Sequence, residues 1–341
     1  MSKNYLITGG AGFIGANYVH RLIERGETVT IYDNLIRAGA SKNLAWLEET
    51  FGEKGSKLIV GDVADAARLT EAAADADVIV HLAGQVAVTT SVTNPREDFE
   101  ANAFGTFNAL EAARASGRDP VFVYASTNKV YGGMEDVALA EEPTRYRYAD
   151  LEHGCPETQP LDFHSPYGCS KGAGDQYVRD YARIYGLRTV VMRQSCIYGP
   201  RQFGIEDQGW IAWMIIAAVT GKQITIYGNG KQVRDVLHVD DLMDAYDAAI
   251  TKIDVACGQV YNIGGGPENV MSVWAEFGPL LEKLLGDEIP VARGDWRPGD
   301  QKVFYANIRK AERELGWRPK IGVEQGVERL FEWVRANQLL F

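Results

Sequence analysis

Positive charge is scarce in this sequence. Its 341 residues contain 35 Lys and Arg against 46 Asp and Glu, which gives a formal net charge of −11, and no long basic run is present. A nucleic acid or an anionic membrane is therefore excluded as the main partner, because both are bound by clustered positive charge. An anionic small ligand is still compatible if a few Arg or Lys side chains are placed to meet it.

Cysteine, histidine and long apolar runs are also scarce. Cys155, Cys169, Cys196 and Cys257 lack metal-type spacing and the five His residues form no cluster, so we predict no metal site and reduced thiols. The longest purely apolar run, residues 210–219, is too short to span a bilayer and is expected to be a buried helix. The first residues show no secretion-signal pattern, so we expect a cytoplasmic protein.

Short β-rich runs alternate with helical patterns through the first part of the chain. The expected strands are residues 5–8, 28–32, 57–60, 78–82, 121–124 and 188–192. These runs are almost continuously apolar, which is typical of strands buried on both faces of a parallel sheet. Helical patterns lie at about residues 13–26, 65–75, 96–116 and 166–186. The alternation predicts an α/β domain with a doubly wound parallel sheet.

The alternation loosens after residue 193. A Gly-rich loop at 227–230 and a Pro/Gly stretch at 297–299 interrupt shorter elements, and helices are expected near 307–315 and 322–338. No repeat or long linker separates the parts, so we expect a smaller C-terminal domain made of interleaved segments. The expected division is residues 1–193 with about 238–263 for the sheet domain, and about 194–237 with 264–341 for the smaller domain.

A glycine-rich loop follows the first expected strand directly. It reads GGAGFIG at residues 9–15, and a helical pattern comes next. Glycines at this spacing keep the turn tight and let a pyrophosphate approach the backbone, while the helix N-terminus supplies N–H groups and partial positive charge. A motif of this kind between a strand and a helix predicts a dinucleotide-binding site.

An acidic side chain indicates which dinucleotide to expect. Asp33 ends the second strand, where a carboxylate accepts hydrogen bonds from an adenosine ribose and repels a 2′-phosphate. Arg37 is the one nearby feature that favours a phosphate, and we give the acid more weight. We therefore predict NAD rather than NADP, with residues 62–63 near the adenine and residues 82–84 as another close backbone approach.

Tyr167 and Lys171 stand four residues apart in the segment SPYGCSK at residues 165–171. On a helix this spacing places both side chains on one face. A phenol has an unperturbed pKa of about 10, and a neighbouring ammonium favours the phenolate. The pair alone occurs by chance in many helices. Together with a dinucleotide site it predicts removal of a proton from a substrate hydroxyl, with Lys171 lowering the pKa of Tyr167.

These residues together resemble the extended short-chain dehydrogenase/reductase family over essentially the whole chain. The matching motifs are TGGAGFIG at 8–15, HLAG at 81–84, Asn102, VYG at 130–132, Tyr167 with Lys171, and RDVLHVDD at 234–241. The resemblance implies a Rossmann fold, a nicotinamide cofactor and a nucleotide-sugar substrate. It also implies a homodimer in which the helices near 96–116 and 166–186 pair across the interface.

The resemblance assigns residues to three parts of the expected site. The catalytic residues are Thr127, Tyr167 and Lys171. NAD is expected to contact Gly9, Gly12, Phe13, Ile14, Gly15, Asp33, Asn34, Asp62, Val63, Leu82, Ala83, Gly84, Gln85, Asn102, Ala125, Ser126, Tyr167, Lys171, Gln194 and Ser195. The substrate is expected to contact Gln85, Thr127, Asn128, Cys196, Arg201, Gln208, Arg234 and Arg297. Arg234 and Arg297 match the family's phosphate-binding arginines, and a surface salt bridge is the alternative for each.

The two positions after Thr127 distinguish reactions within the family. Relatives that eliminate water from the sugar carry an Asp-Glu pair or a Glu there, which acts as general acid and base. This chain has Asn128 and Lys129 instead. Neither is a carboxylate, so neither performs that role at neutral pH. These residues argue against a dehydratase.

The substrate-side segments are similar to the CDP-tyvelose 2-epimerase group of the family. They read HLAGQVA at 81–87, STNKVYG at 126–132, LDFHSPYGCSK at 161–171 and GNGKQVRD at 228–235. UDP-sugar 4-epimerases usually carry an aromatic residue and an Asn between the Arg and the Tyr-Gly after strand six. Here Arg193 is followed by QSCI at residues 194–197, which argues against simple 4-epimerisation.

The sequence thus predicts a redox-neutral epimerase that inverts C2 of a nucleotide-linked hexose, with a CDP-hexose favoured. Tyr167 would take the proton of the C2 hydroxyl, Thr127 would hydrogen-bond the same oxygen, and the C2 hydride would pass to NAD and back. A UDP-sugar 4-epimerase with the same residues is the main alternative. A non-catalytic NAD-sensing protein is another, but it has no reason to keep all three residues. The nucleotide base and the deoxygenation of the sugar stay open.

Overall fold

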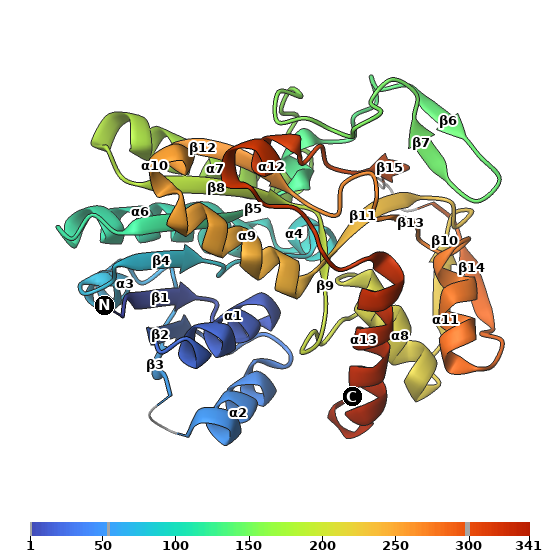
Figure 1. Cartoon of the computed structure of the whole chain (residues 1–341), viewed down its shortest axis with the longest axis horizontal. Coiled ribbons are helices and arrows are strands. Elements are labelled where there is room, and N and C mark those ends of the chain that lie inside the picture. The colour runs from blue at the N-terminus through green and yellow to red at the C-terminus, as the bar shows by residue number, and fades with distance from the viewer. Residues whose placement is uncertain (1, 53–54, 297–300) are drawn as a thin grey trace.

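Seven parallel strands form the central sheet, in the spatial order β12-β8-β5-β4-β1-β2-β3 (Figure 1). The computed structural model describes residues 2–52, 55–296 and 301–341. The strands are β1 (Asn4–Thr8), β2 (Thr28–Asp33), β3 (Lys57–Val60), β4 (Val78–His81), β5 (Val121–Thr127), β8 (Thr189–Gln194) and β12 (Gln259–Ile263). The chain runs outward in both directions from β1, so the predicted doubly wound Rossmann fold is confirmed.

Alternate residues of the strands, except the edge strand β3, enter two different cores. Tyr5 and Ile7 of β1 pack in one core and Leu6 packs in the other, because successive side chains of a strand point to opposite faces. The first core holds α1 (Phe13–Glu24), α2 (Ala40–Phe51), α9 (Val239–Thr251), α10 (Ile253–Ala256) and α12 (Arg309–Leu315). The second holds α3 (Ala66–Ala73), α6 (Gly105–Ala115) and α7 (Ser165–Tyr185). Burial on both faces explains the continuously apolar strands.

Several elements differ from the sequence-based expectations, among them the following. The helix expected over 96–116 is divided into α5 (Pro95–Phe99), a π-helical segment η1 (Glu100–Phe104) and α6. Helix α2 is present, although no pattern was assigned to it, and β12 adds a seventh strand. A π-helical segment has one extra residue per turn and is frequent near functional sites, but it has no hydrophobic period that a sequence reading detects.

A smaller unit lies beside the carboxyl ends of the sheet strands (Figure 1). Its main sheet contains β9 (Cys196–Tyr198), β11 (Val233–His238), β13 (Val270–Ser272) and β15 (Val303–Phe304), and a second sheet pairs β10 (Ile224–Tyr227) with β14 (Val291–Gly294). A separate core packs α8 (Trp210–Thr220), α11 (Phe277–Leu285) and α13 (Val323–Ala336). The helix expected over 210–219 is therefore present and buried.

Short elements complete the fold. They are α4 (Val88–Thr93), a 3-10 turn η2 (Asn128–Tyr131), the hairpin β6 (Leu139–Glu141) and β7 (Tyr146–Tyr148), and a final turn η3 (Gln338–Leu340). Among the residues that the structure describes, no helix has the length and apolar character needed to cross a membrane. The same residues contain no group of His, Cys, Asp or Glu side chains arranged to hold a metal ion.

Candidate active site

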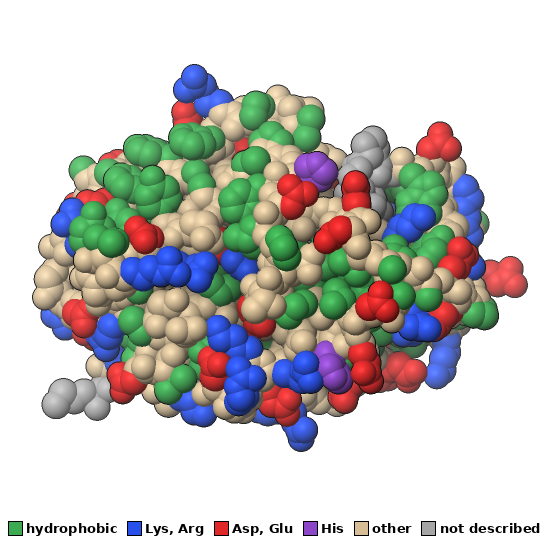
Figure 2. All heavy atoms as spheres, turned by 90° about the horizontal axis from the view of Figure 1, so that it is seen from above, with side chains coloured by type: hydrophobic (Ala, Val, Ile, Leu, Met, Phe, Trp, Pro, Cys, Tyr) green, Lys and Arg blue, Asp and Glu red, His purple; other side chains and the backbone are tan. Residues whose placement is uncertain are grey.

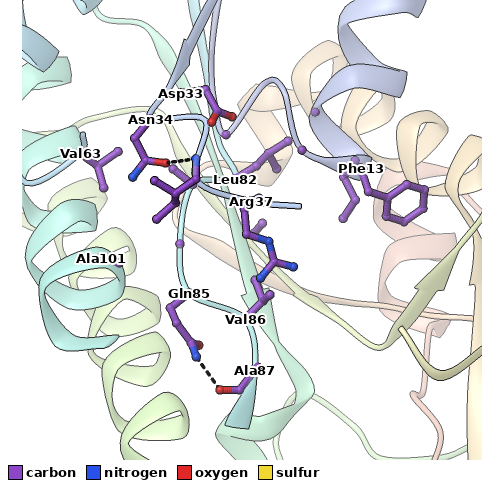
Figure 3. A pocket seen from close by; sticks show the side chains of 18 of the residues that line it. Phe13, Asp33, Asn34, Arg37, Val63, Leu82, Gln85, Val86, Ala87 and Ala101 are labelled. Atoms are coloured by element: carbon purple, nitrogen blue, oxygen red, sulfur yellow. Dashed lines mark hydrogen bonds between the residues drawn. The ribbon is translucent and has the colours of Figure 1, made fainter. Parts of the chain in front are cut away.

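A cavity of about 430 Å³ opens at the carboxyl ends of β1, β2, β4 and β5. This edge of an open parallel sheet is where such folds bind ligands. The cavity walls contain most of the residues predicted to contact a dinucleotide, namely Gly9, Gly12, Phe13, Ile14, Gly15, Asp33, Asn34, Asp62, Val63, Leu82, Ala83, Gly84, Gln85, Ala125, Ser126, Tyr167, Lys171 and Gln194. Figure 3 shows several of these side chains around the cavity.

The glycine-rich loop has no room for a side chain at Gly9 or Gly15. Gly9 has a φ of +71°, and a Cβ atom there would lie 2.7 Å from the backbone nitrogen of Ala83. A Cβ at Gly15 would lie 2.6 Å from the Cα of Gly10 and would also meet the carbonyl oxygen of Gly9. The backbone between β1 and α1 is therefore closely packed and directly accessible from the cavity, as binding of a pyrophosphate requires.

Side chains from two neighbouring elements hold this loop in place. The Asp33 carboxylate at the end of β2 accepts hydrogen bonds from the backbone N–H groups of Ala11 (3.0 Å) and Leu35 (2.8 Å). The Asn43 amide of α2 donates to the carbonyl of Ala11 (3.1 Å). A carboxylate has about four acceptor positions, so Asp33 can accept further hydrogen bonds from a ribose diol bound in the cavity. Next to it, Asn34 donates to the Asp62 carboxylate (2.8 Å).

Tyr167 and Lys171 lie one turn apart on α7, as the spacing predicts, and both side chains are buried. Helix α7 begins at Ser165 with proline at its start, which suits the first turn of a helix. The Lys171 ammonium donates to the carbonyl of Ala125 (2.6 Å) and lies 4.4 Å from the ring centroid of Tyr124. The pair is thus anchored between α7 and β5.

In the protein by itself, the surroundings of Tyr167 raise its pKa. Burial raises the pKa of Tyr167 to about 12, while a hydrogen bond with Thr127 acts against this rise, the charge of Asp98 adds to it and that of Arg37 opposes it. Lys171 is not among the groups that shift this pKa, and its ammonium donates to the Ala125 carbonyl. Burial also lowers the pKa of Lys171 to about 8, against the charges of Asp175 and Asp98.

A second cavity of about 220 Å³ adjoins the first. Its walls include Thr127, Ser195, Cys196, Gln202 and Trp210. Residues common to both cavities are Phe13, Ile14, Val86, Ser126, Tyr167, Gln194 and Gln208. Tyr167 therefore stands at the boundary between a long cleft and a smaller pocket. A group bound in each cavity would meet at its hydroxyl, next to that of Thr127.

Two buried carboxylates support this region, and sequence reasoning missed both. Asp98 is completely buried and accepts hydrogen bonds from Ser170 Oγ (2.5 Å) and Asn102 Nδ2 (3.0 Å). Asp175 is also completely buried and forms a two-point ion pair with Arg193, at 2.8 and 2.9 Å. Ser126 Oγ donates to the same Asp175 carboxylate (2.8 Å). Only the polar residues at helical spacing within α7 could have indicated this network.

Several predicted site residues lie outside the two cavity walls. Asn102 packs against Gly84, because a Cβ atom on that glycine would lie 2.4 Å from Oδ1 of Asn102. Asn128 is buried in η2. The Arg201 guanidinium lies between the rings of Trp46 (4.1 Å) and Trp333 (5.6 Å). Arg234 is buried on β11 and donates to the carbonyl of Val233 (2.8 Å).

Arg297 lies outside the described residues.

The cavity walls also contain residues that were not predicted. In the larger cavity these are Tyr32, Ile36, Arg37, Gly61, Val86, Ala87, Thr90, Glu97, Ala101 and Ile205. Gln208 was expected at the substrate alone, and Arg37 was noted only as a possible phosphate contact. No sequence signal places the loop around Ile205 near the end of β2, because that proximity arises from tertiary packing.

Comparison with known proteins gives the following relatives. The family described as GDP-mannose 4,6 dehydratase matches residues 6–330. A CDP-paratose 2-epimerase from Salmonella typhi is 43% identical over 338 residues, covering 97% of this chain and 99% of that protein. A UDP-glucose 4-epimerase from Thermotoga maritima, solved with UDP-glucose, is similar with a TM-score of 0.83 and 30% identity, covering 98% of this chain and 99% of that one.

A third relative carries a bound dinucleotide. It is a dTDP-glucose 4,6-dehydratase from Streptomyces venezuelae, solved as a double mutant with NAD. Its TM-score is 0.85 at 29% identity, and the similarity covers 99% of this chain and 98% of that one. The relatives therefore share the fold over their full lengths but catalyse different reactions on different sugars.

Proposed function

The chain belongs to the extended short-chain dehydrogenase/reductase family, in the group described as GDP-mannose 4,6 dehydratase, and from this premise we propose that it is an NAD-dependent nucleotide-sugar epimerase. The reaction we propose is inversion of C2 of a nucleotide-linked hexose, with a CDP-hexose as substrate. One observation carries the proposal. Tyr167 lines both the long cleft and the smaller pocket, and its side chain hydrogen-bonds that of Thr127.

The larger cavity suits NAD. Its loop at residues 9–15 presents bare backbone where any Cβ would collide, and Asp33 keeps acceptor capacity for a ribose diol. Residues 62–63 and 82–84 would lie along the adenosine, and Lys171 would lie at the nicotinamide ribose. When bound, NAD accepts a hydride from the sugar carbon and gives it back to the same carbon.

Tyr167 would act on the proton of the sugar hydroxyl. With a pKa of about 12 the phenol is neutral near pH 7, so proton removal needs more positive charge beside it. Lys171, together with the positive charge of a bound nicotinamide, would supply that charge; the Lys171 pKa of about 8 leaves it mostly protonated at neutral pH, since Asp175 and Asp98 counteract its burial. Thr127 would donate a hydrogen bond to the same sugar oxygen and keep it in reach of the phenol.

The residues after Thr127 support epimerisation over elimination. Asn128 is buried in η2, and the Lys129 ammonium donates to Gln301 (3.2 Å). Neither offers a carboxylate to carry a proton to or from a neighbouring sugar carbon. The oxidised sugar would therefore only be reduced again, on its other face.

A UDP-sugar 4-epimerase is the second candidate. The similarity to the Thermotoga maritima UDP-glucose 4-epimerase favours it, because one Tyr, Lys and Thr set serves either carbon, depending on the pose of the sugar. The 43% identity to a CDP-paratose 2-epimerase over nearly the whole chain supports C2 instead. So does the pocket wall, where Cys196 presents a thiol rather than an amide.

Product analysis tests the proposal. The purified protein would be offered CDP-, UDP- and GDP-hexoses without added NAD, and the inverted carbon would be assigned by NMR. We expect inversion at C2 of a CDP-hexose. A substrate deuterated at C2 should keep its label in ordinary water, because the same hydride returns. Tyr167→Phe is the matched control, since it keeps the ring and removes the hydroxyl, and it should fold normally while losing nearly all turnover.

Each other outcome of this experiment has a definite meaning. Inversion at C4 alone would replace the first candidate by the second. Loss of the C2 label to solvent would indicate enolisation instead of hydride return. Near-normal turnover of Tyr167→Phe would remove the proposed base.

We further infer that two copies of the chain associate through the outer side of α5, η1, α6 and α7. Large apolar side chains are exposed there, namely Phe99, Phe104, Phe107, Tyr177 and Ile184. In Figure 2 hydrophobic side chains gather at the left of the view, over the end of the molecule that holds α6 and α7 in Figure 1. A monomer rarely leaves so many large apolar side chains together in water.

A further inference from the structure

Two loops meet across the mouth of the larger cavity. The first, residues 34–39, follows β2 in the Rossmann domain, and the second, residues 200–209, connects β9 to α8 in the smaller unit. We call them the latch loops. Both contribute to the wall of the cavity, the first through Ile36 and Arg37 and the second through Ile205 and Gln208. The cleft is therefore bordered by two parts of the chain that are far apart in sequence.

A side-chain hydrogen bond joins the tips of the latch loops. The Arg37 guanidinium donates from Nη2 to Oε1 of Gln208. Gln208 is held firmly, because its backbone exchanges two hydrogen bonds with Ile205, at 2.9 and 3.0 Å, in a tight turn. Arg37 therefore contacts a rigid partner. Figure 3 shows the Arg37 side chain reaching into the cavity toward Val86.

A second contact fixes the loops at their base. Gly39 has a φ of +89°, and a Cβ atom there would lie 2.6 Å from Cγ of Phe203, so the aromatic ring rests directly on the glycine backbone. Behind this contact, Arg201 is held between Trp46 of α2 and Trp333 of α13. Asn17 of α1 also donates to the carbonyl of Pro200 (3.0 Å). The second loop is thus anchored on both parts of the molecule.

The position of Arg37 relates it to both ends of the cleft. Desolvation lowers the pKa of its guanidinium, and the fields of Asp33 and Tyr167 counteract this effect. Asp33 lies at the end of the cleft where the adenosine ribose is expected. Tyr167 lies at the other end of the cleft, where the smaller pocket begins. A dinucleotide that extends from one to the other carries its pyrophosphate in between. A guanidinium in that interval is suited to hold phosphate oxygens in place.

We propose that Arg37 and Gln208 form a latch that closes over the bound dinucleotide and retains it in the protein. Arg37 would bridge between the dinucleotide and the second loop, so that release requires the loops to separate. An epimerase recovers its cofactor unchanged in every cycle, so retention costs it nothing; this link to turnover rests on the proposed function. Gln208 also lines the smaller pocket, so the same contact would order one wall of the sugar site.

A double-mutant cycle tests the latch. Arg37→Met and Gln208→Leu each remove the hydrogen bond and keep most of the side-chain volume, and Arg313→Met on α12, outside both cavity walls, is the matched control. Each protein would be loaded with radiolabelled NAD and chased with excess unlabelled NAD, and the bound label would be followed by filtration. No sugar is present, so the result does not depend on the proposed reaction. Circular dichroism and thermal unfolding would verify the fold of each variant.

We expect either latch variant to release NAD about tenfold faster, which corresponds to about 1.4 kcal/mol. The double variant should release it no faster than the more affected single variant, because one interaction is lost only once. Arg313→Met should behave as the unmodified protein. Release rates within twofold of the unmodified protein for both single variants would overturn the latch. Fully additive effects would also overturn it, since they would make Arg37 and Gln208 independent contacts.

Discussion

Burial moves Tyr167 and Lys171 toward their neutral forms. The pKa of the phenol rises to about 12 and that of the ammonium falls to about 8, because a low-dielectric environment disfavours either charge. The negative charges of Asp175 and Asp98, which are both completely buried, oppose part of this fall in the Lys171 pKa. Near pH 7 the phenol is therefore neutral and the ammonium mostly protonated, so the proposed proton removal needs the positive charges of Lys171 and of a bound nicotinamide beside the phenol.

Asp235 is a further buried carboxylate, and its burial has a consequence that can be measured. It lies on β11, and its Oδ2 atom accepts hydrogen bonds from the backbone N–H groups of Ala306 (3.1 Å) and Gly266 (3.2 Å). Burial raises the pKa of Asp235 from 3.8 to about 6, against these hydrogen bonds and that of Ser195. Between these pH values the folded protein holds a proton that the unfolded chain has lost.

We therefore predict that Asp235 makes the protein less stable as the pH rises from about 4 to about 6. Asp235→Asn should remove this contribution. The free energy of unfolding of the unmodified protein, relative to the variant, should fall by about 2 kcal/mol between pH 4 and pH 7. Urea denaturation of both proteins at several pH values would measure it. A difference that stays constant with pH would show that Asp235 does not titrate in this window.

The sequence indicates some site residues well and others not at all. Tyr167, Lys171 and the glycine-rich loop are recognisable from spacing, because helix geometry and turn geometry are local properties. Asp98 and Asp175 are not recognisable, because their importance comes from complete burial next to Ser170 and Arg193. For the same reason spacing suggested that Lys171 lowers the pKa of Tyr167, whereas burial dominates the shift.

Elements were predicted where one physical pattern controls them. The six expected strands are all present: five are largely buried and near-continuously apolar, while β3 at the edge of the sheet is largely exposed but keeps a short apolar run. Helix α2 was missed: only Ala40, Asn43 and Leu47 are buried along it, so its apolar stripe is narrow. The π-helical segment η1 interrupts the helix expected over 96–116 and turns Asn102 inward toward Asp98 and Ser170. That interruption satisfies buried polar groups and leaves no trace in the apolar pattern.

The start of α1 provides a prediction at this scale. A Cβ at Gly15 would lie 2.6 Å from the Cα of Gly10, and backbone cannot rotate away as a side chain can. Gly15→Ala should therefore displace α1 from the loop, weaken NAD binding at least about tenfold and destabilise the fold by about 1–3 kcal/mol. Isothermal titration with NAD and urea denaturation would measure both effects.

Gly322→Ala is the matched control for that change. Gly322 has a φ of −69° at the start of α13, and a Cβ there would have no atom within 4 Å. The control should leave NAD affinity unchanged. Equal NAD affinity in the two variants would mean that the close packing of the loop does not position the dinucleotide.

At the scale of the whole molecule, the site depends on segments that only the complete fold brings together. The cavities are bordered by the ends of β1, β2, β4 and β5, by α7, and by the loop at residues 200–209. The sequence predicts the doubly wound domain, since each unit repeats a local pattern. It does not predict that the loops at 34–39 and 200–209 touch, because no local property of either loop encodes the other.

The exposed apolar side of α5–α7 leads to the last prediction. Phe107 and Tyr177 stand edge to face there with ring centroids 6.0 Å apart, and Phe99 and Ile184 are more than half exposed. If this side joins two copies, a charge at its centre must lose its hydration without gaining a partner. Phe107→Glu should therefore convert a dimer to a monomer in light scattering at micromolar concentrations, whereas Val255→Glu on α10, in the other core layer, should not. A monomeric unmodified protein, or a Phe107→Glu variant that stays dimeric, would rule out this interface.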